Sequence, residues 1–499
     1  MYKEFIKIIK NSMIYGIAGI APKVVGFFMI PVYTRFLTPS DYGIMSMLML
    51  LNSFIAIILP LGLDAAFMRF YCDCKNEREK SAVYTTALLF ITVLGFITAI
   101  SLSVFSSQIS SILFSATKYS AYVIAMLIIL LCQLAKLVPV QFVVANEKSV
   151  FYTFYSIGGF LLAISLNIYF IAILKMGVLG FIYSSLIIEV VTAVFLVIVT
   201  LPRKGLEFSF KWLKEMLKFG FPLIFSSLAM FIYMFSDRFF IEKYYSLAAV
   251  GLYSLSLQFG DIISYAIGPF LTARTPFIFS SYKEKNAKEM FSRLFTYSSL
   301  VFCFIGLGLS VCIKDVFSIV VGREFFEAYK LVPIVVLAIL FRTSFYSLSI
   351  GISIMKKTGF IVYIYTVAAI VNILLLVFLI PKFGALGAAI SRAITFLILL
   401  LLGYEISQKL FYIKYEFKRI AQMAILALGL YFISTFIPSK PVIVSIILKG
   451  ALITAFPLVL IIIGFFEKEE IIKIKALTNL RIFRSQFLEK EPIDNKYGL

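Results

Sequence analysis

Apolar runs of about twenty residues recur along almost the whole chain, and this feature limits its fold more than any other. Hydrophobic residues make up 61% of the 499 residues, and charged residues only 14%. An α-helix of about twenty apolar residues can cross the hydrocarbon core of a membrane, whereas transmembrane strands would alternate over about ten residues. We therefore predict an all-α polytopic membrane protein with about 14 transmembrane helices. The expected spans are 12–34, 42–66, 82–104, 119–145, 150–174, 177–201, 219–241, 246–273, 294–313, 330–355, 360–380, 384–404, 420–438 and 442–465.

The basic residues between the spans indicate an orientation. With the N-terminus inside, the cytoplasmic segments hold 29 of the 46 lysines and arginines, and the outer loops hold nine. Basic residues concentrate on the cytoplasmic side of membrane proteins, so both termini are expected in the cytoplasm. The net charge of +20, distributed in this way, favours membrane lipids with anionic headgroups as partners and argues against nucleic acid.

The two halves of the chain repeat. The stretch Tyr42–Ser46 recurs as Val250–Ser254, and Gly177–Gly180 recurs as Gly384–Gly387, at offsets of 208 and 207 residues. Each half holds six spans, so the halves insert in the same orientation, and a site is expected between them near the middle of the membrane. The predicted organisation is an N-lobe (1–201), a cytoplasmic amphipathic linker (202–218), a C-lobe (219–404), a second cytoplasmic linker (405–419), spans 13 and 14 (420–465) and a basic cytoplasmic tail (466–499).

The composition argues against several kinds of chemistry. The chain has no histidine, which is the usual proton carrier near neutral pH and the commonest metal ligand. Of the five cysteines only Cys72 and Cys74 lie close together, and no other residues complete a metal site around them. No nucleotide-binding loop or nucleophile triad is visible. We therefore expect no cofactor, no metal and no enzymatic activity.

Charged residues inside the spans give the strongest functional signal. A charge at the centre of a spanning helix costs roughly 2.5–3.5 kcal/mol, so such residues usually face a bundle interior or a wet cavity. Bases outnumber acids in these positions, which predicts a site for an anion. The bases are Lys23, Arg69, Lys136, Arg238, Arg274, Arg342, Arg392 and Lys449, and the acids are Asp64, Glu189, Asp237 and Asp261.

Three of these bases are candidates for substrate contact by position. Lys23 lies near the middle of the first span, where a lysine cannot easily reach either surface. It either contacts the substrate or pairs with a buried acid such as Asp64. Arg69 and Arg274 lie at the inner ends of the second and eighth spans, which are equivalent places in the two lobes, although headgroup contact would also explain either one.

Arg342 is the fourth candidate, and acids complicate its role. It lies mid-span, but Asp261 could neutralise it. Asp237 and Arg238 are neighbours near the outer end of the seventh span, where a local ion pair is expected. The acids Asp64, Asp237 and Asp261 thus belong either to ion pairs or to coupling of transport.

The other bases are expected to be structural. Lys136 and Glu189 are predicted to pair within the N-lobe. Arg392 and Lys449 lie about eight residues from the outer face, where a long basic side chain can extend to the headgroups.

Four motifs in order along the chain resemble those of the polysaccharide-unit flippases, the O-antigen translocases. They are Pro31–Gly43, Ser236–Ile241, Val250–Ser254 and Ile380–Ala389. That family belongs to the superfamily of multidrug, oligosaccharidyl-lipid and polysaccharide exporters. The resemblance implies two six-helix lobes in a V, with two extra helices added at the side.

The resemblance also implies a function. The protein would carry a polyprenyl-pyrophosphate-linked oligosaccharide repeat unit from the inner to the outer leaflet of a bacterial cytoplasmic membrane. Its product would serve a surface polysaccharide such as O-antigen lipopolysaccharide or capsule, alongside a glycan polymerase and glycosyltransferases. A pyrophosphate needs fixed positive charge in a region of low dielectric constant, which agrees with the excess of bases.

Lipid II flippases of the same superfamily differ from this chain at two places. They share the pattern of Lys23–Phe27, but they carry an arginine where this chain has Met29. They also have an arginine early in the eighth span, and Tyr253–Gly260 contains none. These departures favour a polysaccharide repeat unit over lipid II.

Three other functions fit the sequence less well. A multidrug exporter of the same superfamily would use cavity acids to bind organic cations, but bases dominate here. A membrane-bound glycan polymerase or ligase would need a sizeable outer loop with catalytic groups, and the expected outer loops are short. An export scaffold without transport would not need buried charge.

Overall fold

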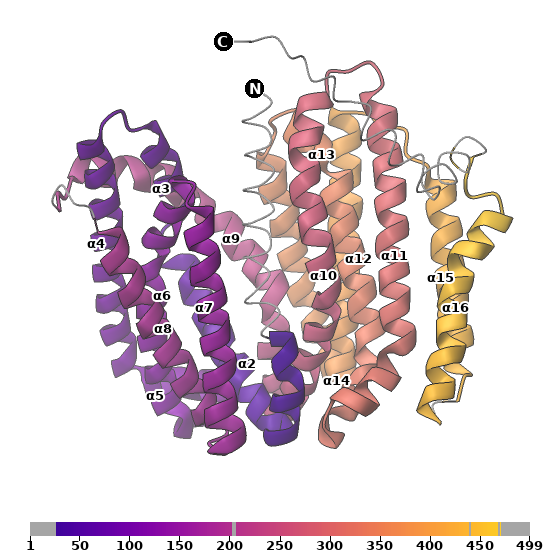
Figure 1. Cartoon of the computed structure of the whole chain (residues 1–499), viewed down its shortest axis with the longest axis horizontal. Helices are drawn as coiled ribbons and strands as arrows, with labels where there is room; N and C mark the ends of the chain where they lie inside the picture. Colours follow the sequence, from indigo (N-terminus) through magenta and orange to yellow (C-terminus); the bar gives the residue numbers. More distant parts are fainter. Residues whose placement is uncertain (1–25, 202–205, 439–440, 468–469, 471–499) are drawn as a thin grey trace, which may run out of the picture. The chain divides into compact units, whose positions relative to one another are not determined.

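The computed structural model describes residues 26–201, 206–438, 441–467 and 470. Within these ranges the chain is helical and contains no strand (Figure 1). Residues 26–36 form a helix. The other elements are α2 (Pro39–Ile58), α3 (Leu63–Asp73), α4 (Glu77–Val104), α5 (Ser106–Phe114), η1 (Thr117–Tyr119), α6 (Ser120–Ala145), α7 (Ser149–Asn167), η2 (Ile168–Ile173), α8 (Val178–Thr200), α9 (Phe210–Tyr244), α10 (Leu247–Ser281), α11 (Ala287–Val320), η3 (Arg323–Leu331), α12 (Val332–Leu348), α13 (Ile350–Ile354), α14 (Gly359–Leu410), α15 (Phe417–Thr435) and α16 (Val442–Ile462).

The expected spans correspond closely to these helices. Twelve helical segments of the described chain are long and apolar enough to cross a membrane. One of them, α14, contains two expected spans. Within it Asn372 donates a hydrogen bond to Thr395 at 3.1 Å. A straight helix would separate these two residues by about 35 Å, so the chain must reverse between them. Thirteen of the expected spans are thus described, and the first is described only from residue 26. The prediction of a multi-pass helical membrane protein is confirmed.

The reversal in α14 reproduces a turn of the first half. Gly384 has φ 57° and ψ −134°, and Gly177, which precedes α8, has φ 59° and ψ −134°. Residues with a side chain rarely adopt this backbone conformation, whereas glycine does so readily. The two glycines are the ones that the sequence repeat aligns, so the repeat extends to the backbone of the turn between the last two spans of each half.

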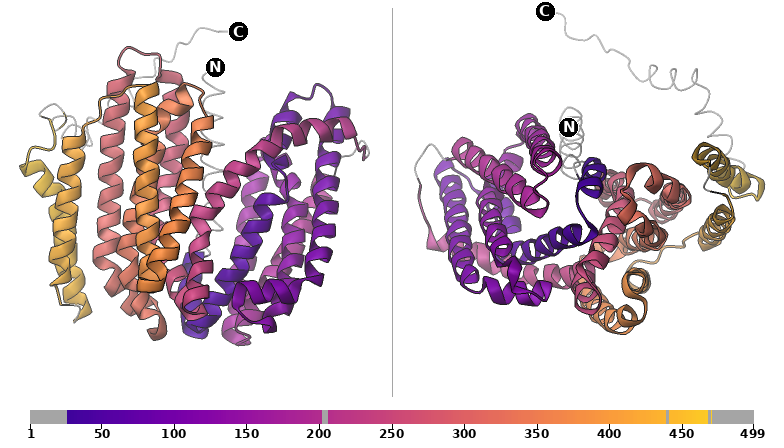
Figure 2. Two further views of the ribbon diagram at one scale, coloured as in Figure 1. Left: turned by 180° about the vertical axis from the view of Figure 1, so that it is seen from behind. Right: turned by 90° about the horizontal axis from the view of Figure 1, so that it is seen from below.

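By its internal contacts the chain divides into two compact units. One comprises Met1–Phe295 and Ile313–Lys414, and the other comprises Thr296–Cys312 and Tyr415–Leu499. In the first unit α4, α6, α7 and α8 pack against one another, as do α9, α10, α12 and α14. Helix α9 also contacts α2, α3 and α4, so it joins the two groups, and Figure 2 shows it running obliquely from one to the other.

Helix α9 corrects one expectation about the central linker. The sequence predicts the amphipathic linker at 202–218 as a segment apart from the seventh span. The helix does begin there, with the Ser209 hydroxyl accepting a hydrogen bond from the Trp212 N–H, but it continues unbroken to Tyr244. Pro222 lies inside it without ending it, as membrane helices tolerate. The amphipathic segment is therefore continuous with the helix of the seventh span.

The second expected span is broken. Helix α2 begins at a capping box in which Thr38 and Asp41 exchange hydrogen bonds, and it ends at Ile58. The chain then passes through Leu61 and Gly62, both with positive φ, before α3 begins. Here the backbone of Gly62 approaches that of Gly220 on α9 so closely that a side chain on either would collide with the other helix.

The second unit has its own core. Buried side chains of α15, α16 and the Thr296–Cys312 part of α11 form it, among them Met423, Phe456 and Leu460. At one end Arg419 forms ion pairs with Glu416, Glu467 and Glu470 at 3.2–3.5 Å.

Two charged groups in this unit, Glu470 and Lys449, are buried. Burial would raise the pKa of Glu470, but hydrogen bonds from Tyr297 and Arg419 hold that pKa below its usual range. Lys449 is 3% exposed, so the expectation that it extends to the membrane surface is wrong.

Candidate functional site

The repeated stretches Tyr42–Ser46 and Val250–Ser254 meet each other where α2 crosses α10. A side chain at Gly43 would collide with the carbonyl of Leu247, and one at Gly251 would collide with the carbonyl of Pro39. Pro39 lies four residues before Gly43, and Leu247 lies four residues before Gly251. The contact is therefore reciprocal, as a pseudo-twofold axis through the crossing requires, and glycine is needed at both positions because the backbones touch.

Hydroxyl groups continue this crossing. The Ser46 and Ser254 hydroxyl oxygens are 2.6 Å apart, and the two serines are related by the repeat. Tyr42 donates a hydrogen bond to Gln258 in the same interface. Arg238 of α9 donates from Nε to the Ser46 hydroxyl at 3.1 Å. An arginine of the second half thus joins the contact between the repeated helices.

A buried ion-pair network lies next to this arginine. Arg392 of α14 pairs with Asp237 of α9 at 2.6 Å, and Tyr253 of α10 donates to the same carboxylate oxygen at 2.5 Å. Arg238 lies 3.6 Å from the other carboxylate oxygen, and its own backbone N–H donates to that oxygen at 2.9 Å. The predicted pairing of Asp237 with Arg238 is confirmed, but the carboxylate is shared between two arginines.

The position of Arg392 differs from the sequence-based expectation. It was expected to extend to the outer surface, and it is only 6% exposed. Besides Asp237 it donates to the carbonyl of Met234 and to the Tyr253 hydroxyl. Taking a charge out of water is costly unless it is paired and hydrogen-bonded, and Arg392 meets both conditions. Its guanidinium holds α9, α10 and α14 together.

Arg342 and Asp261 form a looser pair in the same group of helices. Their closest atoms are 3.9 Å apart, and Ser264 lies between them, accepting from Arg342 at 3.1 Å and facing Asp261 at 3.4 Å. The Asp261 side chain is 48% exposed, whereas that of Arg342 is 16% exposed. Arg342 also lies over the ring of Phe396 at 5.7 Å. Asp261 therefore lies close enough to pair with Arg342, as the sequence suggests, but their 3.9 Å separation is long for an ion pair.

Arg69 and Arg274 are less equivalent than their positions in the repeat suggested. Arg274 is 9% exposed and donates to the Ser347 hydroxyl at 2.6 Å and to the Tyr346 carbonyl at 2.9 Å, both on α12. Arg69 is exposed, and its guanidinium lies over the ring of Phe219 at 4.7 Å. Of the two, Arg69 is the one that an incoming anion can reach directly.

Two expected site residues remain to be placed. Asp64 is exposed in the first turn of α3. Lys23 lies outside the described residues. Among the described residues no group of three or more acids or cysteines could hold a metal ion.

The polar residues of the first half form a separate chain of contacts. Lys136 pairs with Glu189, as predicted, and also lies 3.5 Å from the Thr192 hydroxyl. Gln133 donates to Glu189 at 3.2 Å and accepts from Asn52 at 2.8 Å. These contacts join α2, α6 and α8 and leave Glu189 with a base of its own.

Comparison with known proteins identifies the family. The family model described as "Polysaccharide biosynthesis protein" matches residues 32–330 of this chain. The chain belongs to this family. A protein of the Lsg locus of Haemophilus influenzae is 23% identical over 330 residues, which cover 64% of this chain and 78% of that protein.

Solved structures show which fold this polysaccharide biosynthesis protein has. It is similar to the lipid II flippase MurJ in an inward closed conformation, with a TM-score of 0.71, 14% identity, and coverage of 89% of this chain and 98% of MurJ. It is also similar to an inward-facing multidrug resistance MATE family transporter of the MOP superfamily, with a TM-score of 0.61, 15% identity, and coverage of 78% and 94%. The fold is therefore MurJ-like and MATE-like, and the resemblance inferred from the motifs is confirmed.

Several residues in the contacts of this polysaccharide biosynthesis protein were not predicted from the sequence. No contacts were predicted for Tyr253 and Gln258, although Tyr253 lies in the repeated stretch Val250–Ser254 and Gln258 lies one helical turn after it. Lys136 and Arg342 are 206 residues apart, which is close to the repeat offset, and each pairs with an acid on another helix. This spacing could have revealed them as repeat-related bases.

Proposed function

We propose that this protein is a flippase. It moves a polyprenyl-pyrophosphate-linked oligosaccharide repeat unit from the cytoplasmic to the outer leaflet of a bacterial cytoplasmic membrane by alternating access. The repeat unit is destined for a surface polysaccharide such as O-antigen or capsule, and the cytoplasmic side is the one that holds both termini. Membership of the polysaccharide biosynthesis family and the MurJ-like fold support this proposal.

The observation that carries the proposal is the balance of charge within the spans. Two arginines, Arg392 and Arg238, share the single carboxylate of Asp237. Arg342 has only a loose partner, and Arg69 lies over an aromatic ring. The membrane-embedded part of the protein is therefore net positive, which suits a pyrophosphate and does not suit an organic cation.

The crossing of α2 and α10 supports alternating access. In the proposed orientation α2 and α10 begin at the outer face, so their glycine contact holds the two repeats together on that side. Release of the sugar to the outside would require this contact to open. The hydrogen bond between the Ser46 and Ser254 hydroxyls would add little resistance to this opening, because a hydrogen bond of this kind contributes about 1 kcal/mol.

The test is flipping by the purified full-length chain. A fluorescent polyprenyl-pyrophosphate oligosaccharide is placed in the proteoliposome membrane, and its sugar is probed from outside with a glycosidase. We expect the chain to make the inner-leaflet pool accessible, while empty liposomes keep about half of the sugar protected. Protection of the same half of the sugar as in empty liposomes, in the presence of folded protein, would contradict the proposed function.

Lys23 tests the proposed substrate contact. Lys23→Ala should abolish surface glycan at an unchanged protein level, and Lys23→Arg should keep part of the activity, because its charge survives while its shape changes. The matched control is Lys136→Met combined with Glu189→Gln, which removes another mid-span lysine together with its own acid and should retain export. Normal export by Lys23→Ala would remove Lys23 from the site.

A further inference from the structure

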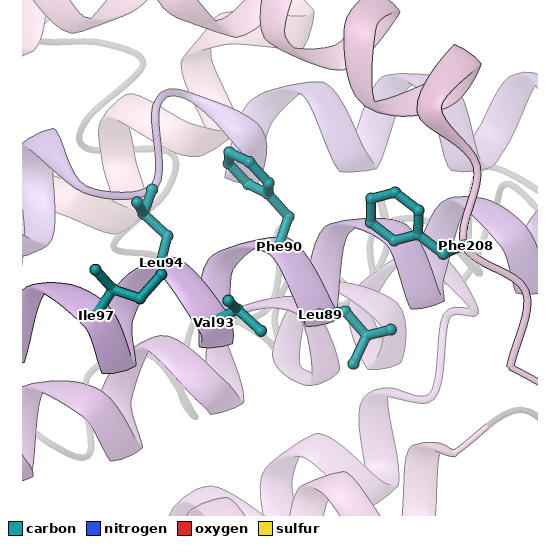
Figure 3. A pocket seen from close by; sticks show the side chains of 6 residues that line it. All are labelled: Leu89, Phe90, Val93, Leu94, Ile97 and Phe208. Carbon is teal, nitrogen blue, oxygen red and sulfur yellow. The ribbon is translucent and has the colours of Figure 1, made fainter.

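An apolar hollow lies on the surface of α4, away from the charged residues described above. Its volume is about 380 Å³. Figure 3 shows five of its lining side chains along α4, with Phe208 reaching toward them from the segment before α9. The lining residues are Leu89, Phe90, Val93, Leu94, Ile97 and Phe208. Further along α4 the exposed apolar side chains of Phe96, Ile100 and Val104 continue the same surface toward the other end of the helix.

Phe208 is held in place by the residues on either side of it. Glu207 accepts hydrogen bonds from Arg78 Nε at 3.0 Å through both carboxylate oxygens. The Ser209 N–H donates to the Thr86 hydroxyl at 2.9 Å. Arg78 and Thr86 both belong to α4 and lie about 12 Å apart along it. Phe208, on one side of the hollow, is thus fixed to α4, which supplies the other lining residues.

The start of α9, two residues after Phe208, carries three lysines and one acid, Glu215. Lys211, Lys214 and Lys218 are exposed and follow one another at helical spacing, so they lie on one side. Leu213 and Met216 are buried on the other side. A cationic surface therefore begins three residues from the aromatic wall of the hollow.

We propose that this corner of α4 and α9 binds an anionic phospholipid. One acyl chain lies in the hollow against Phe208, and the phosphate lies beside Lys211 and Lys214. Acyl chains are as apolar as the lining, so the hollow gives shape but little preference between lipids. The preference comes from the headgroup, because basic residues at the membrane surface attract anionic lipids. This site is separate from the proposed flippase site, and its occupation does not depend on transport.

The chain contains a built-in reporter for this site. Trp212 is its only tryptophan, and it lies between Phe208 and Lys214 in sequence, with its ring 6.0 Å from that of Phe70. Bromine atoms on acyl chains quench tryptophan fluorescence only at short range. Quenching of the full-length chain in vesicles thus reports which lipid lies next to the start of α9.

Two vesicle compositions measure the preference. In one, brominated phosphatidylglycerol is a minor component of phosphatidylcholine, and in the other, brominated phosphatidylcholine is an equal minor component of phosphatidylglycerol. We expect quenching to be about threefold or more stronger in the first. Equal quenching in the two compositions would overturn the proposal.

Variants separate the headgroup from the chain. Lys211→Gln with Lys214→Gln should abolish the preference, whereas Lys283→Gln with Lys285→Gln, which removes two exposed lysines from the loop after α10, should leave it unchanged. Val93→Phe should fill the hollow and reduce quenching by chain bromines while the headgroup preference remains. A preference that survives the loss of Lys211 and Lys214, or quenching that Val93→Phe does not alter, would contradict the site.

Discussion

Arg392 shows what a buried arginine in a membrane protein requires. Its depth in the span suggested a side chain that extends to the headgroups, but its guanidinium turns inward to Asp237, Tyr253 and a carbonyl. Such an arrangement compensates the loss of hydration only if every partner stays in place. The pair therefore helps to specify how α9, α10 and α14 pack. Its loss should lower the stability of the protein more than it weakens substrate binding.

A double-mutant cycle measures how strongly Arg392 and Asp237 are coupled in stability. Arg392→Met leaves the Asp237 carboxylate without its closest base and should destabilise the protein by about 3–5 kcal/mol. Arg392→Met combined with Asp237→Leu removes both charges and should cost clearly less than the sum of the single changes. The readout is unfolding of the purified protein in detergent.

The control for this cycle is an exposed pair on the same helix. Lys409 and Glu405 lie 2.7 Å apart with side chains 73% and 60% exposed. Lys409→Met should change stability by less than about 1 kcal/mol, as is usual for surface ion pairs. Additive effects of the Arg392 and Asp237 changes would show that the buried pair is not coupled.

At the level of helices, the sequence predicted most of what the structure contains. Apolar runs located the spans because length and hydrophobicity decide whether a helix can cross a membrane. The alignment of Gly177 with Gly384, and of Tyr42–Ser46 with Val250–Ser254, identified repeated stretches, and the structure places the first in a repeated turn and the second in the crossing of α2 and α10. Both places need glycine.

Other features of the helices could not be predicted, for identifiable reasons. Amphipathic spacing in the linker at 202–218 does not tell whether that segment joins the helix of the next span, as it does in α9. The interruption between α2 and α3 has positive φ at Leu61 and Gly62 and a close contact between Gly62 and Gly220, and an apolar run does not encode either feature. The pairing of Asp237 with Arg392 joins residues 155 positions apart, and no local pattern encodes it.

The crossing of α2 and α10 makes a prediction about movement. With the five native cysteines replaced, Ser46→Cys and Ser254→Cys place two thiols where hydroxyl oxygens lie 2.6 Å apart, so oxidation should join them. The joined helices cannot separate, and flipping in proteoliposomes should fall about tenfold or more and return with reductant. Each single cysteine variant should be insensitive to oxidation. A cross-linked protein that flips at the full rate would show that this contact does not open during transport.

For the molecule as a whole, the net positive charge of the spans bears on the source of energy. The chain has no histidine, Glu189 is paired with Lys136, and Asp237 is shared by two arginines. The exposed acids Asp64 and Asp261 are the remaining candidates among the four for carrying a proton or balancing a sodium ion. With so few acids available, the membrane potential is the better candidate for the driving force.

The predicted drive is electrical. Moving about two negative charges out of an inside-negative cell gains roughly 4.6 kcal/mol at 100 mV, and the field would also draw the empty, net-positive site back inward. Proteoliposomes with the potential and the pH gradient imposed separately test this. Flipping should follow the potential at constant pH, and Asp64→Asn and Asp261→Asn should retain that response. Flipping driven by the pH gradient alone, and lost in either variant, would instead assign coupling to that carboxylate.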